Sequence, residues 1–274
     1  MNKYKNKEWL EKAFLEIGNK VEIGRMCDVS SDTIEYWRKK FNIPKSDKGI
    51  QSNRKFKINE DYFKVIDSEE KAYWLGFIMA DGCITKANAN GDYNRFEINL
   101  KEDDIEHIEK MNKSFDSNYP IKTINNTNKK LNFKTSICSL RISCKKFVDS
   151  LRKNGITPNK TGKENIPNTI PYCLIKHFIR GFFDGDGSIT INKSFRICSF
   201  SINILQEIND YFEKSLQIRF KIYSTDKYNV PFYVIDSLDT KKNKKVLSHL
   251  YDNSNIYLDR KFNRYLKLFC PITQ

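Results

Sequence analysis

The chain has 274 residues, with 48 lysines and arginines against 34 aspartates and glutamates, and a formal net charge of +14. This length can bury the cores of two or three small domains, and the charge favours a polyanionic partner such as nucleic acid, although an AT-rich gene would also raise the lysine content. Seven cysteines without a CxxC pair and only three histidines argue against a zinc site and indicate a reducing compartment. No apolar run approaches the roughly 20 residues of a membrane span. We therefore expect an intracellular protein without membrane contact, in the cytoplasm or nucleoid, or in an organelle or a phage-infected host.

Residues 1–43 are predicted to form a small all-α domain. Apolar residues recur at helical spacing over 7–17, a second short helix covers 21–27, and a third follows the capping residue Ser30. Gly24 and Asp28 stand where a helix-turn-helix unit has its helix crossing and its left-handed turn residue, so the segment resembles such a unit. The third helix would then enter a DNA major groove, and the alternative is a helical cap with a solvated polar face. The base-edge candidates are Ser31, Thr33 and Tyr36, and the phosphate candidates are Arg38, Lys39 and Lys40.

Residues 44–66 are predicted to be a linker. Up to about residue 57 they combine Pro, Ser, Asp, Gly, Asn and basic residues with little apolar periodicity. Such a composition indicates a connection that tracks the DNA backbone rather than a packed element.

An unusual helix opens the next domain, residues 67–162. The Asp67-Ser68-Glu69-Glu70 capping box predicts a helix start just ahead of the run Trp74-Leu75-Gly76-Phe77-Ile78-Met79-Ala80-Asp81-Gly82. Glycine inside a helix costs about 1 kcal/mol against alanine, and a carboxylate at the C-terminal end faces the negative pole of the helix dipole. Taken alone, this motif could also be an ordinary buried helix that ends in a turn.

The rest of this domain alternates between strands and helices. Residues 95–101 alternate strictly between polar and apolar side chains, which predicts a half-buried strand. A helix opens at 103, strands are expected at 121–124 and 136–143, and a helix at 145–153.

Residues 163–274 repeat the same plan about 100 residues later. Their motif is Ile179-Arg180-Gly181-Phe182-Phe183-Asp184-Gly185-Asp186-Gly187, again with glycine third and Asp-Gly eighth and ninth. Pro171 marks the first turn of this helix. Strands are expected at 188–192, 194–201, 220–224 and 232–238, and helices at 204–216 and 243–250.

The two motif helices would form one site if they pack side by side. Gly76 and Gly181 would let their backbones approach, and the terminal glycines would supply left-handed C-caps. Asp81 and Asp186 would then meet, forming a two-carboxylate site for a hard divalent cation. Such a site suits the hydrolysis of a phosphodiester.

The paired motifs resemble those of the LAGLIDADG homing endonucleases, in the form that carries both motifs on one chain. The resemblance implies an α+β fold: two pseudo-twofold-related αββαββα domains form a DNA-binding saddle, beside the small N-terminal helix-turn-helix-like domain. It implies a monomer that binds double-stranded DNA through the polar faces of its sheets, and the alternative is that these faces are only solvated. The strand residues expected to contact DNA are Arg95, Asn99, Arg141 and Arg196.

By the same resemblance, Asp81 and Asp186 would ligate Mg²⁺ or Mn²⁺, helped by the backbone carbonyls of Ala80 and Gly185. The expected product is a double-strand break with short 3′ overhangs at a long asymmetric target. Basic residues assist the transition state in this family, and Lys101 fits that role by its place in its strand, with Ser201 as its expected counterpart. Lys160 and Lys261, which follow the two motifs at similar distances, are further candidates.

Non-cleaving DNA-binding regulators and intron RNA maturases with this fold are the alternatives. Regulators derived from it tend to lose one or both terminal acids, whereas both are present here. Met79 replaces the sixth-position acid that Asp184 retains, but the resemblance assigns no metal to that position. We therefore expect an active nuclease.

Overall fold

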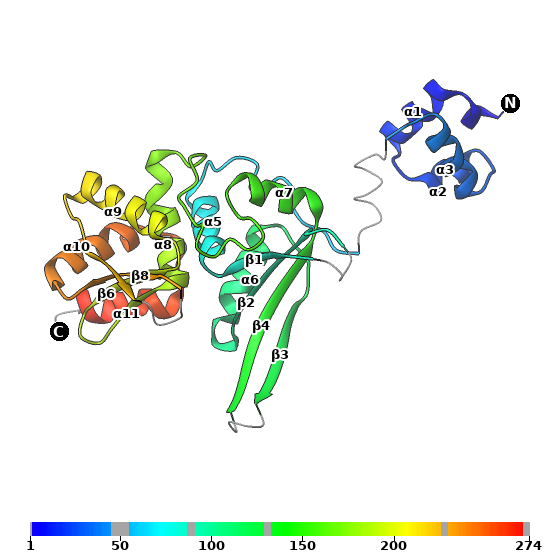
Figure 1. Ribbon diagram of the computed structural model, residues 1–274. Helices are drawn as coiled ribbons and strands as arrows, with labels where there is room; N and C mark the ends of the chain where they lie inside the picture. The colour runs from blue at the N-terminus through cyan, green and yellow to red at the C-terminus, as the bar shows by residue number, and fades with distance from the viewer. Residues whose placement is uncertain (1, 45–54, 87–90, 129–132, 226–229, 271–274) are drawn as a thin grey trace. The chain divides into compact units, whose positions relative to one another are not determined.

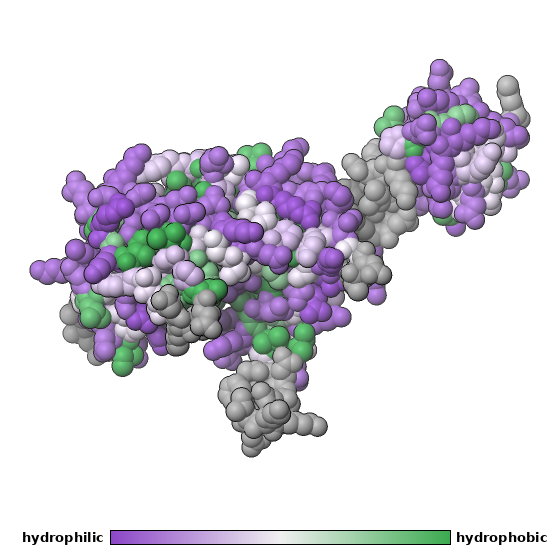
Figure 2. All heavy atoms as spheres, viewed as in Figure 1, coloured by the Kyte–Doolittle hydropathy of each residue, from purple (hydrophilic) through white to green (hydrophobic). Residues whose placement is uncertain are grey.

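The computed structural model describes residues 2–44, 55–86, 91–128, 133–225 and 230–270. By the density of internal contacts the chain divides into two units, residues 1–57 and 58–274. Most of the surface visible in Figure 2 is hydrophilic, as the large number of charged residues leads us to expect. Among the described residues, no helix has the length and apolar character that crossing a membrane requires.

In its described residues, the first unit has three α-helices around a small core. After the 3₁₀ turn η1 (Lys3–Lys5) come α1 (Lys7–Glu16), α2 (Lys20–Met26) and α3 (Ser31–Lys40). Ser30 caps α3 by accepting a hydrogen bond from the Thr33 amide at 3.2 Å. Asp28 has a φ of 53°, and a Cβ on Gly24 would lie 2.7 Å from the Val29 carbonyl oxygen. The predicted left-handed turn and the close crossing of α2 and α3 are therefore both present.

The second unit contains two repeats of one αββαββα pattern, so the predicted fold class is confirmed (Figure 1). The elements of the first repeat are α5 (Glu69–Asp81), β1 (Gly82–Thr85), β2 (Arg95–Lys101), η2 (Glu102–Asp104), α6 (Ile105–Ser114), β3 (Ile121–Asn128), β4 (Phe133–Ser143) and α7 (Lys145–Lys153). Those of the second are η3 (Tyr172–Leu174), α8 (Ile175–Asp186), β5 (Gly187–Ile189), β6 (Phe195–Ser199), α9 (Ile202–Leu216), β7 (Ile222–Thr225), β8 (Phe232–Ser237), α10 (Thr240–Tyr251) and α11 (Asp259–Phe269).

Each repeat has one antiparallel four-stranded sheet, in the orders β1-β2-β4-β3 and β5-β6-β8-β7. The registers correspond, because Gly82 pairs with Ile98 and Gly187 pairs with Ile197. In β2 and β6 the apolar side chains, such as Phe96 and Ile98, are buried against the helices, and the alternate side chains lie on the opposite face. The pairs β3–β4 and β7–β8 differ greatly in length, and Figure 1 shows β3 and β4 extending well beyond the helices.

The motif helices α5 and α8 form the most extensive contact between any two described elements. A Cβ on Gly76 would lie 2.0 Å from the carbonyl oxygen of Phe178, and a Cβ on Gly181 would lie 2.0 Å from that of Tyr73. No side chain fits at such distances. The structure therefore places both predicted interface glycines where the two backbones touch.

The predicted left-handed caps at the motif ends are wrong. Gly82 and Gly187 have φ values of −82° and −93° and are extended, because each is already the first residue of a strand. Glycine is required there for space: a Cβ would lie 2.8 Å from the Ile78 side chain in one copy and 2.2 Å from the Phe183 ring in the other. The helix turns directly into the sheet, which points the preceding carboxylates out of the core.

Three other details differ from the sequence predictions. The predicted linker, 44–66, is shorter, because the second unit begins at Ile58 and Phe63 is fully buried; its residues 45–54 lie outside the described part. Ser68, rather than Asp67, caps α5 by accepting a hydrogen bond from the Lys71 amide. Helix α11 was not predicted, although its residues Lys261, Tyr265 and Phe269 are buried on one face.

Candidate active site and nucleic-acid interface

Asp81 and Asp186 are the last residues of α5 and α8, and the crossing of these helices brings them together. The Asp81 Oδ2 atom lies 3.0 Å from the point where a Cβ on Gly185 would be, so the first carboxylate lies against the end of the second helix. Both carboxylates remain open to solvent. Loss of surrounding water, and then the negative charge of Asp81, raise the pKa of Asp186 to about 7.

Two lysines flank this pair, one from each repeat. The Lys160 ammonium donates hydrogen bonds to the carbonyl oxygens of Met79 (2.6 Å) and Ala80 (3.0 Å). The Lys261 ammonium donates to those of Phe183 (2.7 Å), Asp184 (2.6 Å) and Gly185 (3.2 Å). Both ammonium groups thus lie at the negative ends of α5 and α8, where a cation is favourable. Burial lowers the pKa of Lys261 to about 8 and lowers that of Lys160 in the same direction.

Lys101, the basic residue that fitted best by its position, lies on the exposed face of β2. The cations whose charge acts most strongly on both carboxylates are Lys160 and Lys261. The expected counterpart of Lys101, Ser201, is wrong. Lys101 lies three residues after Ile98, the strand partner of Gly82, and the residue three after Ile197, the strand partner of Gly187, is Phe200.

The donor set fits a magnesium-like ion. Mg²⁺ is commonly held by one or two carboxylates together with substrate phosphates and water, rather than by a cage of protein ligands. In the described residues no cluster of three or more His, Cys, Asp or Glu side chains could hold a metal. Asp81 and Asp186 would hold the ion. The Ala80 and Gly185 carbonyls already accept a lysine hydrogen bond, and each has a second lone pair.

The raised pKa of Asp186 predicts a pH-dependent stability. Because the folded state holds this proton more tightly than the unfolded state, the free energy of unfolding should fall as the pH rises from about 4 through 7. Asp186→Asn removes that decline. In metal-free buffer we therefore expect the melting temperature of the variant, relative to wild type, to increase between pH 5 and pH 8.

Thermal denaturation at both pH values in EDTA measures this difference. The exposed carboxylate Asp103 provides the control variant Asp103→Asn, which should follow the wild-type pH dependence. Added Mn²⁺ should raise the melting temperature of wild type more than that of Asp186→Asn. Parallel curves for wild type and Asp186→Asn would show that this carboxylate has an ordinary pKa.

The flanking lysines should matter more for cleavage than Lys101. Lys160→Met or Lys261→Met keeps the buried aliphatic stem but removes a positive charge beside the carboxylates, and should slow cleavage by about 10²-fold. Lys101→Met should change the cleavage rate at most a few fold. Single-turnover rates at saturating protein separate the two cases, and an equal loss in all three variants would contradict the assignment.

The predicted strand contacts all lie on the sheet faces that point away from the helices. Arg141 is directly opposite Glu97 and forms an ion pair with it at 3.0 Å, and the Asn99 amide donates to the same carboxylate at 3.2 Å. Arg196 is opposite Asp236 and is ion-paired to it. Arg95 lies on the same face of β2. These surface pairs are weak, so the arginines can exchange their partners for phosphates.

In the first unit, five of the six predicted contacts lie on the surface or near it, and one does not. Tyr36 is 59% exposed, with the Lys40 ammonium 5.9 Å from its ring centre. The Thr33 hydroxyl is bonded to that of Ser30 at 3.0 Å. Arg38 was wrongly assigned to phosphate. Its side chain is 11% exposed and donates to the Glu35 carboxylate and to the Ile43 carbonyl, so it ties the end of α3 together. Ser31 and Lys39, the other predicted contacts, also lie on α3.

A buried polar network supports the second motif and was not predicted. The Asp184 carboxylate is fully buried and accepts hydrogen bonds from the hydroxyls of Tyr73 and Tyr251 and from the Leu258 amide, at 2.8, 2.5 and 2.8 Å. One turn earlier, Arg180 donates to the Ile256 and Leu250 carbonyls. Because these bonds hold the segment that leads into α11, Asp184 orders the approach to Lys261 rather than contacting the ion. The apolar residues around Asp184 gave no sign in the sequence that its carboxylate has buried hydrogen-bond partners.

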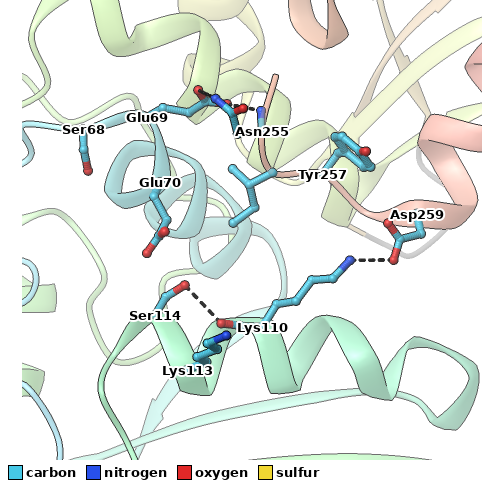
Figure 3. Close-up of a pocket in the computed structure, with 10 residues that line it drawn as sticks. Ser68, Glu69, Glu70, Lys110, Lys113, Ser114, Asn255, Tyr257 and Asp259 are labelled. Carbon is cyan, nitrogen blue, oxygen red and sulfur yellow. Dashed lines mark hydrogen bonds and ion pairs between the residues drawn. The ribbon is translucent and has the colours of Figure 1, made fainter. Parts of the chain in front are cut away.

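A cavity of about 590 Å³ lies at the other end of α5, roughly 18 Å from its last residue. Figure 3 shows interactions among the residues that line it: Lys110 donates to Asp259 at 2.7 Å, and Glu69 accepts from Asn255. It has no part in the carboxylate site.

Comparisons with known proteins agree with this geometry. Residues 174–260 match the family described as LAGLIDADG-like domain. Comparison with curated protein sequences finds no match. The homing endonuclease I-WcaI, solved with its DNA recognition sequence, superimposes with a TM-score of 0.51 at 18% identity, over 74% of this chain and 91% of that one. The meganuclease I-SmaMI, solved with uncleavable DNA, gives a TM-score of 0.51 at 14% identity, over 74% and 90%. Residues 174–260 thus match the LAGLIDADG-like family, and the chain has the fold of the homing endonuclease I-WcaI and the meganuclease I-SmaMI.

Proposed function

We propose that this protein is a site-specific endonuclease that hydrolyses phosphodiester bonds in double-stranded DNA with Mg²⁺ or Mn²⁺. The observation that carries this proposal is the meeting of Asp81 and Asp186 at the ends of α5 and α8, open to solvent. A structural carboxylate pair would be neutralised by bonded partners, as the buried Asp184 is. Two open carboxylates beside two buried lysines instead suit an ion and a phosphate.

The residues at this site have separable roles. Asp81 and Asp186 would hold the ion, which would act as a Lewis acid and activate water for attack on the phosphate. Lys160 and Lys261 hold positive charge where the phosphate gains negative charge, and they are locked in place by their carbonyl partners. The short connections from each aspartate into β1 and β5 keep the carboxylates at the inner edge of the two sheets.

DNA is proposed to lie across the two sheet faces that carry Arg95, Asn99, Arg141 and Arg196. I-WcaI and I-SmaMI, which share the fold, were each solved with DNA. In the first unit, the exposed residues of α3 would add a separate grip on the DNA, with Tyr36 as a base contact and Lys39 and Lys40 as phosphate contacts.

Both carboxylates come from one chain, so we propose that the protein cuts as a monomer. The two repeats differ in sequence at every matched sheet row described below, which favours an asymmetric target. Cleavage of both strands with short 3′ overhangs is the family outcome, and we propose it here on the strength of the fold.

Incubation of the full chain with a randomised duplex library and Mg²⁺, followed by sequencing of the cut ends, tests the proposal. A nuclease of this kind should return one long asymmetric sequence, cut on both strands with a constant 3′ overhang, and no product in EDTA. Enrichment of a bound sequence without cleavage in Mg²⁺ or Mn²⁺ would instead favour the regulator. Preferential binding of structured RNA would favour the maturase.

A further inference from the structure

The outward faces of the two sheets differ strongly in charge. The strands of the first sheet carry Arg95, Lys101, Lys122 and Arg141 against Glu97. Those of the second sheet carry Arg196 against Asp236. The first face is therefore basic, whereas the second is close to neutral. Phosphate attraction, which supplies most of the sequence-independent affinity for DNA, must come mainly from the first.

The matching registers allow a comparison of the two faces row by row. Along one row the first sheet has Asn99, Ser139 and Lys122 side by side. The equivalent row of the second sheet is Cys198, Val234 and Tyr223. A polar row in one repeat is thus an apolar row in the other, at the same distance from the active carboxylates.

The neighbouring row is largely apolar in both repeats, but the second repeat has two aromatic rings there. Lys101, Ile137 and Ile124 correspond to Phe200, Phe232 and Thr225, and the two phenylalanine rings are 5.0 Å apart. The apolar row borders a groove of about 560 Å³ whose walls include Tyr223, Val234 and Leu238. Tyr223 is 46% exposed and Leu238 is 75% exposed, so the groove presents apolar surface to solvent.

This groove is continuous with the proposed DNA-binding surface. The Arg196–Asp236 pair lines it, and Arg196 is directly opposite Ser188, which follows Asp186 by two residues. DNA that reaches the carboxylates must therefore pass along it. In the major groove, the C5-methyl group of thymine is the apolar feature that side chains can recognise.

We propose that the second repeat reads its half-site through thymine methyl groups, which contact the row Cys198, Val234 and Tyr223. The first repeat reads its own half-site through polar base edges and phosphates. This inference rests on the proposed endonuclease function.

Strand length adds a second asymmetry: β3 and β4 have 8 and 11 residues, whereas β7 and β8 have 4 and 6. At about 3.4 Å per residue, the first sheet follows up to about 10 base pairs and the second about 6.

The test uses the target duplex obtained from the library, with binding by the full chain measured in EDTA so that no cleavage occurs. Each thymine of one half-site is replaced by deoxyuridine, which removes the methyl group but keeps base pairing. Affinity should fall about fourfold for each contacted methyl in the half-site of the second repeat. It should change little in the half-site of the first repeat.

Variants copied from the first sheet sharpen the test. Val234→Ser and Tyr223→Lys, which install the residues found at positions 139 and 122, should bind the thymine and uracil duplexes equally. Ser139→Val is the matched control and should leave the uracil effect unchanged.

An equal loss in both half-sites, no loss in either, or a selected half-site without thymine would overturn the proposal while the endonuclease function stands. Dimerisation of the full chain that Tyr223→Lys abolishes, without a uracil effect, would assign the groove to a second copy instead. Failure to select any DNA would count against the endonuclease function itself.

Discussion

Replacing Asp81 or Asp186 with asparagine is expected to abolish cleavage of the target duplex while leaving its affinity nearly unchanged. Each aspartate supplies one of two carboxylates at the end of the α5–α8 pair, and an amide of the same shape cannot replace the negative charge that a hard cation requires. The cleavage rate should fall by about 10³-fold or more. Binding should be retained, because the sheet faces and the core are unaltered. Single-turnover cleavage and a gel-shift titration of the same protein separate the two effects.

The control for this experiment is Asp103→Asn, which removes an exposed carboxylate of the same charge at a distance from the motif. It should cleave at the wild-type rate. Wild-type cleavage by either active-site variant would refute the assignment of the site. A parallel loss of binding and cleavage would mean that the two aspartates support the fold rather than the reaction.

Substituting alanine for Gly76 or Gly181 is expected to destabilise the second unit by about 3 kcal/mol or more. The new methyl group would lie 2.0 Å from a carbonyl oxygen of the facing helix, and neither backbone can yield without separating α5 from α8. The sign of the effect is diagnostic. Helix propensity alone would make the same substitution stabilising by about 1 kcal/mol.

Urea denaturation gives the free energy of unfolding for each variant. Ala72→Gly, on the same buried helix, is the control and should cost only about 1–2 kcal/mol through propensity and a lost methyl contact. A stabilised Gly76→Ala or Gly181→Ala would contradict the close helix contact. Where folded variant remains, its cleavage should also be reduced, because the two carboxylates would no longer meet.

The carboxylate pair could be predicted from the sequence because its motif is local and occurs twice. Apolar side chains around a helix, an interior glycine and a terminal Asp-Gly together contradict ordinary helix preferences, and one repetition makes chance a poor explanation. Strand alternation at 95–101 likewise assigned Arg95 and Asn99 to the polar face, as the structure has them. The order of elements followed from hydrophobic period alone.

The predictions that failed depended on partners that the local pattern of residue types does not specify. The left-handed caps were wrong because strand pairing, not local conformation, sets the backbone of Gly82 and Gly187. Arg38 was assigned to phosphate because a basic residue late in a helix suggests a surface, whereas Glu35 and the Ile43 carbonyl turn it inward. The catalytic role of Lys101 stays a prediction; its strand position could be inferred from the sequence, whereas the place of Lys160 and Lys261 beside the carboxylates could not.

The sequence by itself therefore determined the repeat, the fold class and the two aspartates, because each is encoded within a single helix or strand. Only the tertiary structure decided which lysines lie at the helix ends, how Asp184 is satisfied, and that one matched row of the two sheets is polar in the first repeat and apolar in the second. These features depend on hydrogen bonds and strand registers that join residues up to 111 positions apart, and no local pattern records which partner a side chain will meet.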